Sequence, residues 1–117
     1  MSLAALVLAF AFQQAPTAPP DRIAPQTHDS KQIYVMACVK CHGEDGRGDT
    51  EKGRKLKAPD FTSSKWFDET TDKEILETIR NGVKNKKGKL LMPAFRSKLT
   101  AGQIQTLAGY VRTFHKK

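Results

Sequence analysis

Two cysteines separated by two residues and followed directly by a histidine form the pattern Cys38-x-x-Cys41-His42, which constrains this chain more than any other feature. In a helical turn, thiols three positions apart lie on one face. From there they can reach two vinyl groups on one side of a porphyrin and form thioethers. The imidazole that follows is delivered to the iron from one face, and neutral imidazole is a good iron ligand. The motif predicts one haem c, held covalently through Cys38 and Cys41, with His42 as a ligand of the iron.

Three other interpretations of these residues compete with haem attachment. A redox-active thiol pair would follow a buried strand of a βαβ unit, whereas an amphipathic helical pattern precedes Cys38. A zinc site would need ligands from a second Cys or His pair. The chain has no other cysteine, and we expect His28 and His115 to be exposed to solvent rather than ligands. Coincidence is disfavoured because Cys and His are rare residues.

The composition also favours a large apolar cofactor. Outside residues 1–15, 39 of 102 residues are apolar or glycine, about 38%, against roughly 45–50% in an average globular domain. A domain this small and this polar is short of core and needs a staple, a partner or a cofactor. Haem is an apolar plate around which such a chain could fold.

The N-terminus predicts a leader and a linker. Leu3–Phe12 is an unbroken apolar run, too short to span a bilayer and suited to the core of a secretory signal. We therefore predict a signal peptide or hydrophobic leader over 1–15 and export to the periplasm or its equivalent, with a membrane tether if the leader is retained. Residues 16–28 contain four prolines and are typical of an extended linker. The folded domain is expected over 29–117.

Three helical patterns and no convincing strand alternation indicate an all-α fold. Apolar residues recur at helical spacing near 30–40, 72–81 and 101–115. Each pattern starts at a residue that could cap a helix: Asp29 or Ser30, Thr71 in a capping box with Glu74, and Thr100 in a capping box with Gln103. Gly82 is expected to end the second helix. The glycine-rich stretch 43–70 is expected to be a long loop, which is reasonable if it wraps something large and apolar.

Met92 is the candidate for a second iron ligand. Pro93 restricts Met92 to extended backbone, which breaks the helix and lets the thioether project inward from a loop. Met36 lies two residues before Cys38 on the same helix and cannot easily reach the opposite face of the iron, so we expect it to fill the core.

Taken together, the region 30–117 resembles the small mono-haem class I cytochromes c of the bacterial type. The resemblance rests on five segments: Cys38-Val39-Lys40-Cys41-His42-Gly43, Ala58-Pro59-Asp60-Phe61, Asn81-Gly82, Met92-Pro93-Ala94-Phe95 and the last helix. It implies three main helices plus long loops wrapped around one covalent haem, with the first and last helices crossing near the haem edge.

The resemblance also implies roles for residues outside the motif. Tyr34 is expected to pack near the helix crossing with Tyr110 or Phe114. The carbonyl of Pro59 is expected to accept a hydrogen bond from the second ring nitrogen of His42, which would orient the imidazole. For Trp66, contact with a haem propionate and ordinary core packing are both open.

Ligation by both His42 and Met92 leaves no open position on the iron. The interpretation is therefore a one-electron carrier between respiratory or other redox partners, without an enzymatic activity or small-molecule substrate of its own. A haem-bearing subunit of a dehydrogenase or oxidase is an alternative. A haem enzyme or gas sensor with a labile Met92 is a second.

The charge is concentrated around Met92. The net charge is +8, and residues 84–98 contain no acid. An exposed basic ring of this kind would steer an acidic redox partner, and we expect docking at Lys84, Lys86, Lys87 and Lys89, next to Arg96 and Lys98 in the sequence. A solvated loop is the alternative. No motif for nucleic-acid recognition accompanies the charge. A carrier of this kind is expected to be a monomer or weakly associated.

Overall fold

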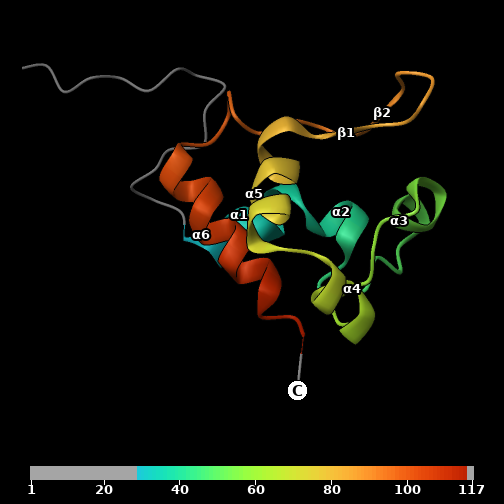
Figure 1. Ribbon diagram of the computed structural model, residues 1–117, viewed down its shortest axis with the longest axis horizontal. Coiled ribbons are helices and arrows are strands. Elements are labelled where there is room, and N and C mark those ends of the chain that lie inside the picture. Colours follow the sequence, from blue (N-terminus) through green and yellow to red (C-terminus); the bar gives the residue numbers. More distant parts are fainter. Residues whose placement is uncertain (1–28, 116–117) are drawn as a thin grey trace, which may run out of the picture.

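The computed structural model describes residues 29–115 (Figure 1). The leader predicted for 1–15 and the linker predicted for 16–28 lie outside the described residues. The elements, in chain order, are α1 (Ser30–Ala37), α2 (Val39–His42), α3 (Glu51–Leu56), α4 (Ser64–Glu69), α5 (Asp72–Asn81), β1 (Val83–Lys84), β2 (Leu90–Met92) and α6 (Ala101–Arg112).

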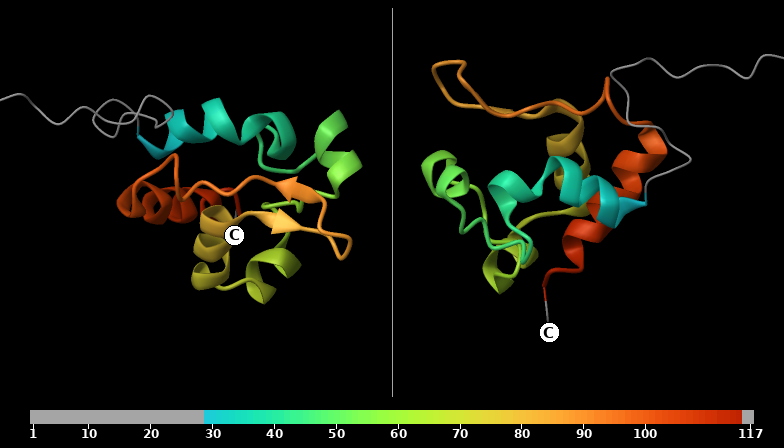
Figure 2. Two further views of the ribbon diagram at one scale, coloured as in Figure 1. Left: turned by 90° about the horizontal axis from the view of Figure 1, so that it is seen from above. Right: turned by 180° about the vertical axis from the view of Figure 1, so that it is seen from behind.

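The first and last long helices cross, as expected, and their crossing forms one side of the core (Figures 1 and 2). Ile33 and Tyr34 of α1 are buried. The ring of Tyr34 lies 5.4 Å from that of Tyr110 and 5.0 Å from that of Phe114, centroid to centroid. Both aromatic neighbours offered by the sequence therefore pack on Tyr34, and burying rings of this size is a large stabilising term for a small domain.

A second helix, α5, packs against α6 and completes the set of three main helices. Its buried side chains are Ile75 and Ile79, four residues apart on one face. The loop that leads into α6 is tied to α5 because the amide of Phe95 donates to the carbonyl of Ile79 at 3.0 Å. The all-α prediction is confirmed for these elements.

The three main helices begin at the predicted caps. The side chains of Asp29, Thr71 and Thr100 accept from the amides of Gln32, Glu74 and Gln103 at 2.9, 3.1 and 3.1 Å. In each case the glutamine or glutamate returns a bond to the backbone amide of the cap. Reciprocal bonds of this kind satisfy amides that the first helical turn leaves free.

The expected long loop over 43–70 is wrong in part, because it contains α3 and α4. Thr50 caps α3 by accepting from the amide of Gly53 at 2.8 Å, and Ser63 caps α4 by accepting from the amide of Trp66 at 3.3 Å. Each helix has six residues, fewer than two turns. Such a length is too short to display an apolar period, so the pattern could not reveal them.

The expectation that the chain has no strands is also wrong in part, because a short β-hairpin lies between α5 and α6. β1 and β2 pair antiparallel, with Val83 opposite Met92 and Lys84 opposite Leu90. The side chain of Asn85 closes the turn by accepting from the amides of Lys87 and Lys89 at 2.9 Å each. Strands of two and three residues are too short to show alternation. The hairpin tip projects from the body of the molecule (Figures 1 and 2).

The expectation that Met36 fills the core is wrong, since 59% of the residue is exposed. The buried positions of α1 are Ile33 and Tyr34, with Ala37 packed against the core beside them. Met36 falls outside this narrow face. A helix of only two turns buries one stripe, and the apolar character of Met36 does not place it there.

Candidate haem site

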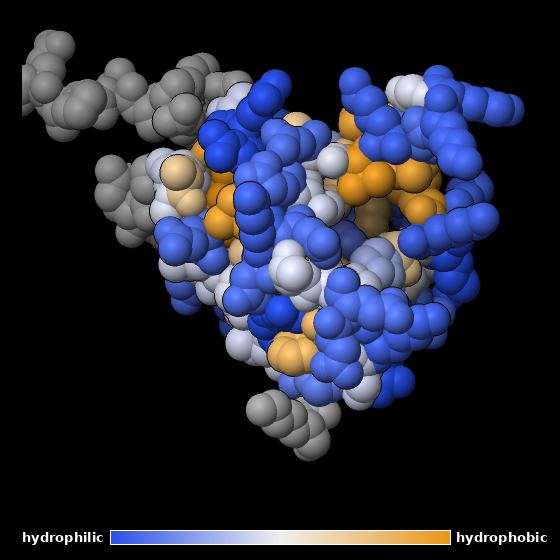
Figure 3. All heavy atoms as spheres, viewed as in Figure 1, coloured by the Kyte–Doolittle hydropathy of each residue, from blue (hydrophilic) through white to orange (hydrophobic). Residues whose placement is uncertain are grey.

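One apolar cavity of about 400 Å³ gathers all the residues that the sequence singled out for haem. Cys38, Cys41 and His42 reach it from α2 and its N-cap, Pro59 from the chain between α3 and α4, and Met92 from β2. Most of the remaining wall is apolar, from helices, loops and the hairpin: Leu56, Phe61, Ile75, Ile79, Val83, Leu91, Phe95, Leu107 and Val111. Figure 3 shows a hollow lined by apolar residues and bordered by hydrophilic ones. The volume and character are those of a ligand site.

The two cysteines are free thiols on a tight helical turn. The amides of Cys41 and His42 both donate to the carbonyl of Cys38, at 3.2 and 2.9 Å. Burial raises the pKa of the Cys38 thiol to about 12, so this sulfur is uncharged at neutral pH. A buried, uncharged thiol is a poor nucleophile, which disfavours a redox-active pair.

His42 is held as a neutral imidazole. Burial lowers the pKa of its ring, which keeps a nitrogen lone pair available to a metal. The ring stacks on Phe61 with centroids 4.6 Å apart and an angle of 19° between the planes. Its Nδ1 is buried without a hydrogen-bond partner among the described residues.

The expected hydrogen bond from His42 to the carbonyl of Pro59 is not formed, because Nδ1 has no partner in the described structure. The Pro59 carbonyl instead lies against Gly48, where an added Cβ would sit 2.9 Å from its oxygen. Pro59 is thus a wall residue of the cavity, without the orienting contact that the resemblance implied.

Met92 occupies the end of β2, half-buried and next to Pro93. Its backbone lies directly against Gly82, which follows α5 with φ +72°. A Cβ at Gly82 would collide with the Met92 carbonyl oxygen and would lie 2.8 Å from the Ala94 nitrogen. The close approach and the left-handed φ both require glycine. The residue that ends α5 thereby also sets where Met92 lies.

Two residues that the sequence analysis did not single out fix the cysteine turn. Thr50 donates its hydroxyl to the carbonyl of Cys41 at 2.8 Å. Gly53 of α3 approaches the same carbonyl so closely that a side chain there would collide with it. Because α3 is too short to show an apolar period, the sequence does not predict the helix or these contacts.

The remaining candidates lie apart from the cavity wall, except Trp66. Met36 and His115 are not among the lining residues. His115 stacks on Phe67 at 4.3 Å, and its Nε2 lies 3.1 Å from the Ser64 hydroxyl. His28 lies outside the described residues. Trp66 both lines the cavity and packs with its ring centre 4.8 Å from that of Phe61, a position compatible with contact to a bound group and with core packing alike.

No cluster of three or more His, Cys, Asp or Glu that could hold a metal ion occurs among residues 29–115. The donors present are instead two thiols, one imidazole and one thioether around an apolar cavity. Zinc prefers a closed shell of thiolate and imidazole ligands. An apolar macrocycle with iron fits the residues, because it takes neutral sulfur, neutral imidazole and apolar walls together.

Basic residues lie on two elements near the cavity. The hairpin carries four exposed lysines: Lys84, Lys86, Lys87 and Lys89. A second group was not foreseen: Lys52 and Lys55 of α3 border a shallow hollow together with Lys40 of α2, and Lys57 lines the cavity. By contrast, Lys98 lies in the loop before α6, outside the hairpin.

Comparison with known proteins places the chain in a family. Residues 25–111 match the family model described as cytochrome c oxidase, cbb3-type, subunit III. The chain is 32% identical over 83 residues to the cbb3-type cytochrome c oxidase subunit FixP of Bradyrhizobium diazoefficiens, covering 71% of this chain and 26% of that protein. It is 33% identical over 109 residues to cytochrome c6 of Rippkaea orientalis, covering 93% and 88%. The chain thus spans about a quarter of its FixP relative.

A solved structure is also similar. The KustC0563 c-type cytochrome superposes with a TM-score of 0.66 at 34% identity, covering 76% of this chain and all of that one. Similarity of fold and sequence together extends the comparison from the motif to nearly the whole described domain.

Proposed function

The chain belongs to the cytochrome c family described by the cbb3-type subunit III model, and from this premise we propose that it is a one-electron carrier with a single haem c. The observation that carries the proposal is the apolar cavity lined jointly by Cys38, Cys41, His42 and Met92. The chain does not need an enzymatic step for this role. Relatives named as a cytochrome c6 and as oxidase subunits support haem-based electron transfer.

Cys38 and Cys41 would hold the haem covalently. Each thiol would add across one vinyl group, so that the S–H bond and the π bond of the vinyl group would be replaced by an S–C bond and a C–H bond, and no oxidant would be needed. His42 and Met92 would be the two protein ligands of the iron. Pro59 would remain a contact of the haem in the cavity wall.

When bound, the haem iron supplies a centre that changes its oxidation state by one electron. The chain's own residues would keep that centre closed: His42 and Met92 would both bind the iron and leave it no open position, and the apolar wall would limit access of water. A methionine and histidine pair also raises the reduction potential. These properties favour electron transfer over oxygen binding or peroxidase chemistry.

The direct test is expression of the full chain in a host that matures c-type cytochromes. We expect a coloured protein whose mass exceeds that of the polypeptide by one haem, with a far-red methionine-to-iron band in the ferric spectrum. Met92→Ala should lose this band and lower the reduction potential. Met36→Ala is the matched control, because Met36 is exposed and outside the cavity.

Two results would contradict the proposal. A colourless wild-type protein with the mass of bare polypeptide would show that the chain binds no covalent haem. A coloured protein that binds carbon monoxide rapidly, without the far-red band, would favour a labile Met92 and therefore the gas-sensor or haem-enzyme alternative.

We propose that acidic redox partners dock on the basic rim formed by the hairpin lysines and the α3 lysines. The hairpin contributes Lys84, Lys86, Lys87 and Lys89, and α3 with its C-cap contributes Lys52, Lys55 and Lys57. Apolar Val83 and Leu90 are exposed on the same hairpin. A charged rim around an apolar patch suits a small, transient interface that is steered electrostatically.

Charge reversal tests the rim. Lys86→Glu with Lys87→Glu should slow electron exchange with an acidic partner at low ionic strength, and the difference from wild type should shrink as salt is added. Lys31→Glu with Lys98→Glu changes the net charge equally, but Lys31 is in α1 and Lys98 is in the loop before α6, both outside the hairpin. Equal rates in both double variants would mean that net charge, rather than a rim, governs the encounter.

The names of several relatives favour a second candidate, a haem-bearing subunit of a larger oxidase assembly. Isolated from its native cells, a free carrier should purify as a monomer. A subunit should instead co-purify with its enzyme at a fixed stoichiometry. This measurement separates the two.

We propose an exported location for the domain, because c-type maturation requires it and because an apolar run precedes the domain. Among residues 29–115 no helix is long and apolar enough to cross a membrane. Mass spectrometry of the mature protein, read at its N-terminus, tests the predicted processing of residues 1–15.

A further inference from the structure

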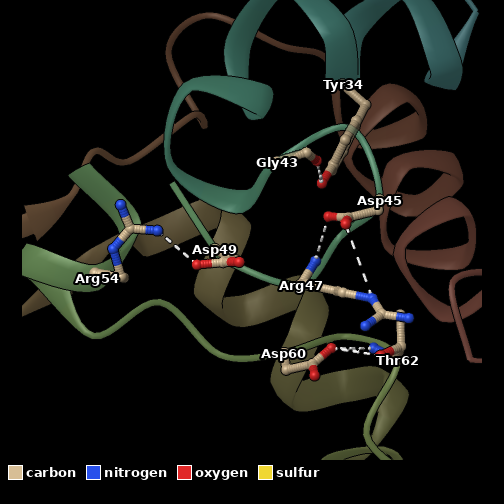
Figure 4. Close-up of polar contacts among 8 residues, drawn as sticks. All are labelled: Tyr34, Gly43, Asp45, Arg47, Asp49, Arg54, Asp60 and Thr62. Carbon is tan, nitrogen blue, oxygen red and sulfur yellow. Dashed lines mark hydrogen bonds and ion pairs between the residues drawn. The ribbon is translucent and has the colours of Figure 1, made fainter. Parts of the chain in front are cut away.

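The hydroxyl of Tyr34 is tied to the backbone that directly follows His42. Tyr34 is 1% exposed, and its hydroxyl donates to the carbonyl of Gly43 at 2.6 Å (Figure 4). Burial raises the pKa of the Tyr34 hydroxyl far above its ordinary value, so the group stays protonated and remains a donor.

This hydrogen bond is distinctive in its target. Among the side-chain hydrogen bonds of residues 29–115, it alone reaches the backbone of His42 or Gly43. Backbone bonds complete the turn: the amide of Gly48 donates to the carbonyl of His42 at 2.8 Å, and that of Gly46 to the carbonyl of Gly43 at 3.2 Å. The turn that carries the imidazole is therefore anchored before His42 by Thr50, at the Cys41 carbonyl, and after it by Tyr34, at the Gly43 carbonyl.

The anchor itself is immobile. The Tyr34 ring is packed between the ends of α1 and α6 by Tyr110 and Phe114. Phe114 in turn lies so close to Gly46 that an added Cβ would be 2.6 Å from its ring. The Tyr34 hydroxyl and the turn after His42 are thus held against the same helix crossing.

Packing alone does not account for the hydroxyl. A phenylalanine ring would fill the same space between α1 and α6, and a buried hydroxyl carries a desolvation cost that only its hydrogen bond offsets. That bond is made to Gly43, the C-cap of α2 and the residue that directly follows His42.

We propose that Tyr34 is a positioning residue for His42: by holding the carbonyl of Gly43, its hydroxyl sets where the imidazole lies in the cavity. The inference rests on the proposed function, in which His42 is a ligand of the haem iron. It goes further by assigning the placement of that ligand to a hydroxyl on a different helix.

The test compares two hydroxyl deletions in the haem-loaded full chain. Tyr34→Phe removes the anchoring hydroxyl and keeps the ring. Tyr110→Phe removes a hydroxyl from the same aromatic cluster, one without a hydrogen bond among the described residues. The measured quantities are the reduction potential, the NMR shifts of the His42 ring protons and the unfolding midpoint.

We expect Tyr34→Phe to shift both the potential and the His42 resonances, and Tyr110→Phe to leave both at the wild-type values. Replacing Tyr34 with 4-aminophenylalanine, which keeps a donor, should restore them. Replacing it with 4-fluorophenylalanine, which is nearly isosteric and has no donor, should reproduce the change and serves if Tyr34→Phe accumulates poorly.

The proposal is overturned if the variants without a donor keep the wild-type potential and resonances and change only the unfolding midpoint, because the hydroxyl would then be merely structural. It is equally overturned if the donor-keeping variant behaves like the donor-free ones. A wild-type protein without haem is a different result, since it contradicts the proposed function itself.

Discussion

At the scale of single residues, the site is made of groups that burial keeps neutral. Cys38 remains a thiol and His42 a neutral imidazole because charge is costly in an apolar cavity. A neutral imidazole keeps the lone pair that binds a metal, and a thioether sulfur carries no charge in the cavity. The composition of the cavity wall thus prepares the chemistry of the residues within it.

Phe61 is expected to restrain the His42 ring through their stack. Phe61→Leu should lose about 0.5–1.5 kcal/mol for the aromatic contact, in addition to the cost of lost volume, and should broaden the His42 ring resonances. Phe95→Leu is the matched control, because both phenylalanines are 6% exposed. Chemical denaturation and NMR check the pair. Identical spectra for the two variants would mean that the stack does not restrain the ring.

Tyr34 should also make the free energy of unfolding depend on pH at alkaline pH. Its pKa is raised in the folded state, so above about pH 10 the unfolded chain loses a proton that the folded chain keeps. The stabilisation is complete below that pH and declines as the pH rises toward the folded-state pKa. Tyr34→Phe should flatten the fall in unfolding free energy between pH 10 and 11, measured by denaturant titration. A slope equal to wild type would refute this.

At the scale of elements, the end of α5 and the strand that carries Met92 are coupled through Gly82. Gly82→Ala places a Cβ against the Met92 carbonyl and strains a φ of +72°. We expect a loss of about 1–3 kcal/mol and a weakened methionine-to-iron band. Thermal unfolding and the ferric spectrum measure the two effects.

Gly109→Ala provides the control for this substitution. Gly109 lies within α6 with nothing within 4 Å of an added Cβ, so alanine should stabilise the helix by about 0.5–1 kcal/mol. If the two glycine variants lose stability equally, the close approach at Gly82 does not matter.

Arg112 joins α6 to α4 and α5. It bonds the Asp72 carboxylate at 2.6 Å and the Phe67 carbonyl at 2.7 Å, and its guanidinium lies 4.2 Å from the Phe67 ring centre. Because the Asp72 side chain is 83% exposed, the ion pair contributes little by itself. We expect about 1–2 kcal/mol lost in Arg112→Ala, and clearly less in Asp72→Ala. Urea denaturation compares them, and equal losses would assign the effect to the ion pair.

At the scale of the whole molecule, the fold is built around a space that the chain does not fill. At about 24 cal/mol per Å³, an empty cavity of about 400 Å³ costs at most roughly 10 kcal/mol, and less where water enters it. That cost is comparable with the total stability of a small domain, about 5–15 kcal/mol. The cofactor is therefore part of the core.

Removal of haem is accordingly expected to abolish cooperative folding. The double variant Cys38→Ala with Cys41→Ala, made in the same host, should lack covalent haem and show no sharp thermal transition by far-UV circular dichroism. The same variant supplied with free haem should regain part of the transition through His42 and Met92. A sharp transition without haem would mean that the chain completes its core alone.

The sequence by itself determined the motif, the three main helices and their caps, and the list of residues that the structure gathers in one cavity. These follow from local rules: thiol spacing, apolar periodicity over two or more turns, and side chains that cap amides three residues away. Met92 could be named because Pro93 forbids helix at that position whatever surrounds it.

Only the tertiary structure decided the rest. α3, α4 and the hairpin are too short to show an apolar period in the sequence. The contacts of Gly53 with Cys41 and of Gly82 with Met92 join segments that are apart in the sequence, so no local pattern predicts them. Met36 is exposed, and the expected bond from His42 to Pro59 is absent. Both outcomes depend on which side chains from other segments pack around these residues. Local chemistry specifies what a residue can do, whereas the packing of distant segments specifies what it touches.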